Sequence, residues 1–166
     1  MMSWKGKKLL SMVAVGVFLA SCSSIDCSVN SLVRTQYQFT SSDGNALTLL
    51  DSLSVVTTTK DGKDTTILNK GVNISTFQLP ISYSHPEDIL VFQFSGSNGL
   101  STADTVWVKK NDYPHFESVD CNAVFFHQLT DVRYTRNCLD SIVIKNPSVT
   151  NDDQVVHLYI YPKTDD

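Results

Sequence analysis

The stretch SLSVVTTTKDGKDTTIL, residues 52–68, indicates the fold of this chain. Two runs rich in threonine and branched aliphatic residues flank Asp61-Gly62, and an Asp-Gly pair between such runs is a strong signal for a β-hairpin. Upstream, Val33, Thr35, Tyr37 and Phe39 alternate with polar residues, which is the period of a strand with one buried face. This part of the chain is therefore predicted to form paired strands.

The rest of the chain continues in the same manner, with short β-prone runs separated by turn residues. Turns are expected at 42–45, 96–99, 111–112 and 151–153, where Gly, Asn, Asp and Ser gather. No stretch keeps a helical apolar period. The pattern predicts one all-β domain over residues 32–166, an immunoglobulin-like antiparallel β-sandwich. Its further strands are expected at 46–50, 74–79, 89–94, 105–109, 123–129, 132–137, 141–144 and 155–161.

The first 21 residues have the organisation of an export signal. Three lysines, at positions 5, 7 and 8, precede an apolar run over residues 9–20, which is too short to span a bilayer as a helix. The run ends in Leu19-Ala20-Ser21-Cys22. An ordinary secretory signal also has a basic start and small residues, but the cysteine directly after Leu-Ala-Ser favours a lipoprotein signal peptide. Cys22 is then the predicted site of lipidation and the first residue of the mature chain.

Charge and composition limit the partners of the exported chain. The full chain has 13 Lys and Arg against 17 Asp and Glu, and loss of the three signal lysines changes its net charge from −4 to about −7. An acidic surface without a basic cluster excludes nucleic-acid binding.

Residues 22–31 are small and polar and are expected to form a lipidated tether. We expect anchoring to the outer membrane on its periplasmic face, with the cell surface as the alternative.

Three cysteines remain after Cys22 is assigned to lipid: Cys27, Cys121 and Cys138. Export places them in an oxidising compartment, where one disulfide is expected and one thiol stays free. Cys27 and Cys121 each follow an aspartate and lie far apart in sequence, so a bridge between them closes a long loop. A Cys121–Cys138 bridge across a hairpin is the alternative. No CxxC spacing supports a metal site.

Catalytic and ligand-binding signals are weak. His115 and His127 flank Cys121 at equal spacing, but the intervening chain is expected to turn, so we predict no metal and no cofactor. There is no Gly-x-Ser-x-Gly elbow, and we expect no enzymatic activity. Trp107 alternates with Val106 and Val108, so it lies on the opposite face of its strand. It is the residue on which a carbohydrate-binding function would depend, although most aromatic residues are expected in the core.

Four hydroxyl residues follow an aspartate and precede an aliphatic residue or threonine. This pattern resembles the acceptor motif of the general O-glycosylation system of exported Bacteroidota proteins. The alternative is that Asp-Ser or Asp-Thr begins a strand after a turn and bonds the backbone locally. The candidate O-glycosylation sites are Ser52, Thr65, Thr105 and Ser141.

Several segments together resemble a family of uncharacterised Bacteroidota lipoproteins that share a domain of unknown function. The most distinctive is His115–Asn122, and the others are Asp26-Cys27, Asp51–Val55, Phe77–Pro80, Asp140–Ile144 with Asn146-Pro147, and His157–Tyr161. The resemblance implies a lipid-anchored β-sandwich in which Cys27 and Cys121 recur and Cys138 is the unpaired thiol. It implies no activity. We therefore expect a non-enzymatic binding or structural protein that contacts the membrane through lipid and other envelope proteins or glycans, with a carbohydrate-binding module as the alternative.

Overall fold

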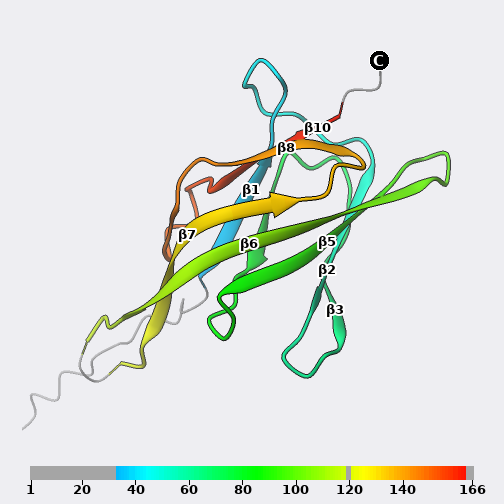
Figure 1. Cartoon of the computed structure of the whole chain (residues 1–166). Coiled ribbons are helices and arrows are strands. Elements are labelled where there is room, and N and C mark those ends of the chain that lie inside the picture. Colours follow the sequence, from blue (N-terminus) through cyan, green and yellow to red (C-terminus); the bar gives the residue numbers. More distant parts are fainter. Residues whose placement is uncertain (1–32, 119–120, 164–166) are drawn as a thin grey trace, which may run out of the picture.

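A computed structural model describes residues 33–118 and 121–163 of the chain (Figure 1). The predicted signal peptide, the tether, Cys22 and Cys27 lie outside the described residues. Within the described ranges, no helix is long and apolar enough to cross a membrane.

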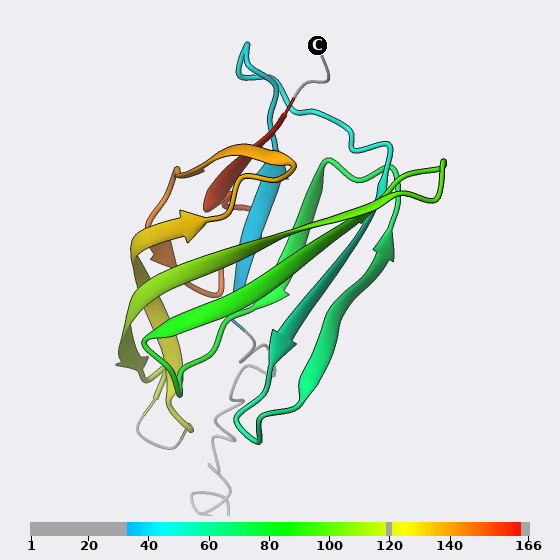
Figure 2. The same cartoon turned by 45° about the vertical axis from the view of Figure 1, so that its right-hand side comes forward.

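The described chain is built from ten strands that form two sheets (Figure 2). The smaller sheet has the order β4-β1-β10-β8, and the larger has the order β3-β2-β5-β6-β7-β9. The two sheets pack face to face, so the prediction of a β-sandwich is confirmed. The strands are β1 (Arg34–Phe39), β2 (Ser52–Thr58), β3 (Asp64–Gly71), β4 (Thr76–Pro80), β5 (Glu87–Ser95), β6 (Ser101–His115), β7 (Val124–Tyr134), β8 (Leu139–Ile144), β9 (Ser148–Val149) and β10 (Leu158–Pro162).

One pair of strands departs from the predicted antiparallel arrangement. β1 and β10 run parallel, with Tyr37 opposite Leu158 and Phe39 opposite Ile160. Parallel neighbours cannot be joined by a tight turn, and these two strands come from opposite ends of the domain. This long-range pairing brings the first and last strands together at the centre of the smaller sheet, and local sequence patterns carry no signal for it.

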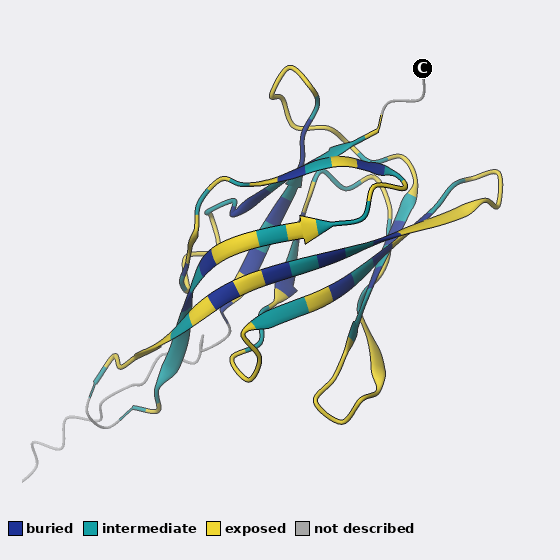
Figure 3. Cartoon of the chain, in the orientation of Figure 1, coloured by how far each residue is buried: buried dark blue, intermediate teal, exposed yellow. Residues whose placement is uncertain are grey.

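The core lies between the sheets and follows the alternation seen in the sequence (Figure 3). In β1 the side chains of Thr35, Tyr37 and Phe39 point inward, and the glutamines between them are only partly buried. Aromatic rings join the two sheets: Tyr37 stacks on Phe77 at 5.1 Å between ring centroids, and Phe92 of the other sheet meets both edge-on. Burying such rings removes large apolar areas from water and fixes the distance between the sheets.

Three turns share one geometry, and each has a glycine at its fourth position. In the predicted hairpin between β2 and β3, the amide of Thr59 donates to the carbonyl of Lys63, and the amide of Gly62 donates back to Thr59. Gly62 has φ of 74°, a conformation that side chains with a Cβ rarely adopt. The same bonds recur in the turns at 41–45 and 96–100, so the Asp61-Gly62 hairpin signal is confirmed.

Other local predictions were wrong. Asn111 and Asp112 do not form a turn, because they lie inside β6, a strand of 15 residues. The runs 123–129 and 132–137 are not two strands, because β7 continues through Thr130 with a shift of register opposite Lys109 and Lys110. Such a β-bulge absorbs one extra residue without ending the strand. Residues 46–50 contribute only isolated bridges.

The outer part of the β6–β7 pair extends beyond the sandwich (Figure 1). Pairing of β5 with β6 stops at Glu87 opposite Lys109, whereas β6 and β7 stay paired as far as His115 opposite Val124. We call residues 111–115 and 124–128 the β6–β7 arm. Cys121 precedes β7 at the outer end of this arm.

Candidate functional site

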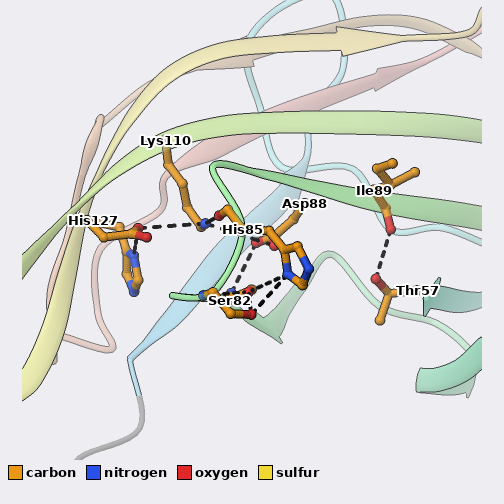
Figure 4. A network of polar contacts seen from close by, with 9 residues as sticks. Thr57, Ser82, His85, Asp88, Ile89, Lys110 and His127 are labelled. Atoms are coloured by element: carbon orange, nitrogen blue, oxygen red, sulfur yellow. Dashed lines mark hydrogen bonds and ion pairs between the residues drawn. The ribbon is translucent and has the colours of Figure 1, made fainter. Parts of the chain in front are cut away.

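A buried lysine forms the centre of the most extensive polar network in the described chain (Figure 4). Lys110 follows Val106 and Val108 on the inward face of β6, and its side chain has no exposed surface. Its Nζ donates to the backbone carbonyl of His85. It also lies 3.6 Å from Oδ1 of Asp112 and 4.0 Å from Oδ1 of Asp88. Two carboxylates and a carbonyl thus compensate a cation that burial would otherwise make very unfavourable.

His127 extends this network onto β7. It lies opposite Asp112 in the β6–β7 register, and its Nδ1 is 2.6 Å from Oδ1 of Asp112. The ring is almost completely buried. Asp112 thus lies between Lys110 and His127, and these contacts tie the base of the β6–β7 arm to the sandwich.

The same network holds the loop between β4 and β5. The amide of Ser82 donates to Oδ2 of Asp88 at 3.1 Å, and Nδ1 of His85 lies 3.3 Å and 3.0 Å from the hydroxyls of Ser82 and Ser84. Burial raises the pKa of Asp88, while the nearby charge of Lys110 acts to lower it. Among the described residues, His85 meets no carboxylate, so the serine–histidine contacts lack the third group that orients a catalytic base. The arrangement is suited to fixing a loop.

Asp104 forms a second buried centre, near the start of β6. Its two carboxylate oxygens accept hydrogen bonds from the Thr135 hydroxyl at 2.5 Å and from the amides of Asn137, Cys138 and Leu139 at 2.8–2.9 Å. Burial acts to raise its pKa, but the hydrogen bonds from Cys138, Thr135 and the backbone outweigh it and lower the pKa to about 2. Asp104 therefore organises the turn between β7 and β8 as a permanent carboxylate.

Cys138 is a free thiol, as the family resemblance implied. The alternative bridge between Cys121 and Cys138 is therefore wrong. The Sγ of Cys138 lies 3.0 Å from Oδ2 of Asp104. Burial, together with this carboxylate, raises the pKa of the thiol to about 12, which suppresses the nucleophilic thiolate. Cys27 lies outside the described residues, so the bridge between Cys27 and Cys121 stays a prediction.

The two histidines that flank Cys121 have different neighbours. His127 bonds Asp112, whereas His115 stacks on Phe126 with 4.3 Å between ring centroids. Over residues 33–118 and 121–163, no group of three or more His, Cys, Asp or Glu side chains is arranged to hold a metal ion.

Trp107 lies on the outer face of the larger sheet, because Val106 and Val108 point into the core. Ile89 and Arg133 are its cross-strand neighbours. The Arg133 guanidinium lies 5.1 Å from the centre of the indole ring and is held there by two hydrogen bonds to Glu87, at 2.9 and 3.0 Å. A sugar that stacks on the face of the ring covered by the guanidinium has to displace Arg133.

The four candidate glycosylation sites differ in accessibility. Thr65 is exposed on β3, an edge strand, and Ser141 is partly exposed on β8, another edge. The hydroxyl of Ser52 bonds the carbonyl of Ser95. Thr105 lies inside the larger sheet between two strands, and the preceding Asp104 is buried and fully engaged. At Thr105 the Asp-Thr pair therefore has the local structural role that was the alternative hypothesis.

The network around Lys110 was not predicted from the sequence, although the sequence contains a signal for it. Lys110 continues the alternation of Val106 and Val108, so a strand without a turn at Asn111 places it on the buried face. The two carboxylates that contact Lys110 are Asp88 on β5 and Asp112, which lies two positions further along β6. Only the pairing of three strands shows that they meet.

The apolar core and the structural use of the buried charges define a β-sandwich domain with polar networks at Asp104 and Lys110, the two limits of the core-facing part of β6. The chain belongs to a family of unknown function, DUF6452, whose model matches residues 52–162. The resemblance to an uncharacterised family is confirmed at this level. The matched region includes the His115–Asn122 segment but not Asp26-Cys27. No curated protein and no solved structure matches the chain.

Proposed function

We propose that this protein is an exported lipoprotein of the bacterial outer membrane whose β-sandwich binds or supports other envelope components without catalysis. The observation that carries the proposal is Leu19-Ala20-Ser21-Cys22 at the end of a basic and then apolar segment. A diacylglyceryl group on Cys22 and a further acyl chain would give stable anchoring, which one chain does not. Lipoproteins of Bacteroidota are the group that the family resemblance implies.

Support for a non-catalytic role comes from how the buried reactive groups are used. Asp104 accepts its hydrogen bonds from one turn, the thiol of Cys138 is held protonated, and Lys110 is enclosed by carboxylates and a carbonyl. Each group stabilises an element of the fold. A reaction at any of them would require breaking the bonds that hold a turn or a loop.

Fatty-acid labelling tests the anchor. Wild-type protein made in a host that processes lipoproteins should incorporate labelled fatty acid and lose residues 1–21. The Cys22→Ser variant should do neither, whereas Cys138→Ser should be labelled as the wild type is. Absence of label on wild-type protein would overturn the proposal. Protease treatment of intact cells distinguishes the proposed periplasmic face from the cell surface, because only a surface protein is cleaved.

Carbohydrate binding is the second candidate, and the outward position of Trp107 in a row with Ile89 and Arg133 favours it. Crosslinking in intact envelopes and a glycan array separate the two functions. Protein partners without glycan signal support the first proposal. Glycan signal that disappears in Trp107→Ala, but not in Leu100→Ala at the 96–100 turn, supports the second, provided that both variants unfold at the wild-type temperature.

O-glycosylation is proposed as a modification of the same exported chain. Thr65 is the one fully exposed site of the four, whereas Ser52, Thr105 and Ser141 are partly exposed, and Thr105 lies on β6 inside the larger sheet. Intact mass should exceed that of the lipidated polypeptide in the native kind of host, and Asp64→Ala should remove more of this excess than Asp104→Ala. An unchanged mass after replacement of all four aspartates would refute the motif.

A further inference from the structure

The chain enters the domain at the end of the sandwich that carries the β6–β7 arm. Val33 directly precedes β1, and Arg34 pairs with Pro80, the last residue of β4. The β4–β5 loop, residues 81–86, therefore starts beside the entry point. The arm projects past this loop, since the amide of Lys110 donates to the carbonyl of Pro86 and β6 continues outward for five more residues (Figure 1).

Aromatic side chains are exposed at this end of the molecule. Tyr83 of the β4–β5 loop is 67% exposed, Tyr113 of the arm 51% and Phe116 at its outer end 62%. The ring of Tyr83 is held by packing, because it stacks on Phe125 with 5.0 Å between ring centroids. Exposed apolar residues also occur at the opposite end, where Leu50 and Leu100 lie, but those are aliphatic. Tyrosine and other amphipathic rings are the residues that favour the interface between lipid headgroups and acyl chains.

The length of chain before the domain limits how far this end can be from the anchor. Cys22 and Val33 are 11 residues apart, which a fully extended chain spans in about 40 Å. The predicted bridge from Cys27 to Cys121 would fix the outer end of the arm to a residue only five positions after Cys22, a reach of about 18 Å. Such a short reach holds the exposed rings close to the bilayer.

We propose that the β6–β7 arm and the β4–β5 loop form a membrane-facing end, in which Tyr83, Tyr113 and Phe116 contact the lipid interface. This inference rests on the proposed lipid anchor at Cys22. Contact of these rings with lipid orients the sandwich, so that the turns at 41–45 and 96–100 point away from the membrane. The binding partner of this end is the bilayer itself, because the lipid anchor keeps the domain at a high effective concentration next to it.

Tryptophan substitutions with quenching by brominated lipid test the orientation. The full chain is produced in a host that processes lipoproteins, and its Phe116→Trp, Tyr113→Trp and Leu100→Trp variants are placed in phosphatidylcholine vesicles with brominated acyl chains. A zwitterionic lipid is chosen because the mature chain is acidic. Trp107 is present in every sample, including the wild type, and provides the baseline.

The tryptophans introduced at positions 116 and 113 should show blue-shifted emission and at least threefold more quenching than the one at position 100. Equal quenching at the two ends, in protein whose acylation at Cys22 is confirmed by mass, would overturn the membrane-facing end and leave the anchor intact. Absence of acylation would overturn the proposed function and this inference with it. Unfolding temperatures of the variants that match the wild type exclude misfolding. Phe116→Trp and Tyr113→Trp give two independent measurements of lipid contact at the arm.

Discussion

Asp104 shows how much of the local structure depends on one side chain. A single carboxylate accepts bonds from one hydroxyl and three amides of residues 135–139, which fixes the path from β7 in one sheet to β8 in the other. The chain thus changes sheets at a point set by side-chain chemistry. Hydrogen bonds to an ionised group are stronger than neutral ones, so this connection is stiff.

Asp104→Asn should lower the free energy of unfolding by about 2–3 kcal/mol at pH 7, because the amide replaces one acceptor oxygen with a donor that faces backbone amides. The effect depends on pH in a defined direction. The pKa of Asp104 is about 2 in the folded protein and near 3.8 in the unfolded chain. The stabilisation by its carboxylate is therefore complete above about pH 4 and disappears as the pH falls toward 2. Urea unfolding between pH 2 and pH 7 measures it. Asp140→Asn, an exposed neighbour on β8, is the control and should change little.

Cys138 should be unreactive in the folded protein. A pKa raised from 9.0 to about 12 lowers the thiolate fraction at pH 8 by roughly a thousandfold. Alkylation by iodoacetamide, followed by peptide mapping, should therefore label Cys138 slowly in native protein and rapidly in urea. Equal rates in the two conditions would contradict the buried bond between the thiol and Asp104.

At the scale of elements, β6 is the strand on which the fold depends. It carries Asp104 near its start, Val106 and Val108 in the core, and Lys110 where the core ends. Its outer residues then continue into the arm. Lys110 lies where the core part of β6 passes into the arm. Its buried ammonium group bonds the β4–β5 loop on one side and Asp112 at the base of the arm on the other.

Lys110→Met should lower the free energy of unfolding by about 3–5 kcal/mol, because Asp88 and Asp112 then remain without their cation in a buried site. Thermal and urea unfolding measure this effect. Lys109→Met, one residue earlier and exposed, is the matched control and should stay within about 0.5 kcal/mol of the wild type. Hydrogen exchange of the Ser82 amide should also accelerate in Lys110→Met. Unchanged exchange would show that the loop is held by other contacts.

At the scale of the whole molecule, the two ends of the sandwich expose different side chains. The chain enters at the end with the arm and the aromatic residues, and the turns with glycines at 44 and 99 lie at the other. The predicted bridge from Cys27 to Cys121 would join the segment before the domain to the arm. It would thereby limit the movement of the sandwich on its tether.

Reduction of that bridge should lower the free energy of unfolding by about 2–5 kcal/mol, because the unfolded chain gains the entropy of a long open loop. Non-reducing peptide mapping should yield a peptide that contains both Cys27 and Cys121. Cys138→Ser should leave this peptide and most of the stability unchanged. Absence of the Cys27–Cys121 peptide, together with a free energy of unfolding that reductant does not change, would show that this bridge does not form.

The sequence by itself determined the class of fold, because alternation in β1 and the Asp61-Gly62 turn are local properties of the backbone and side chains. It also pointed to the candidate anchor, since the predicted export signal is a linear motif. Only the tertiary structure decided the parallel pairing of β1 with β10, the continuity of β7 through its bulge and the position of Trp107 on the outer face. The same holds for the charges around Lys110. These features depend on contacts between residues far apart in the chain, whose energies exist only after the sheets have formed.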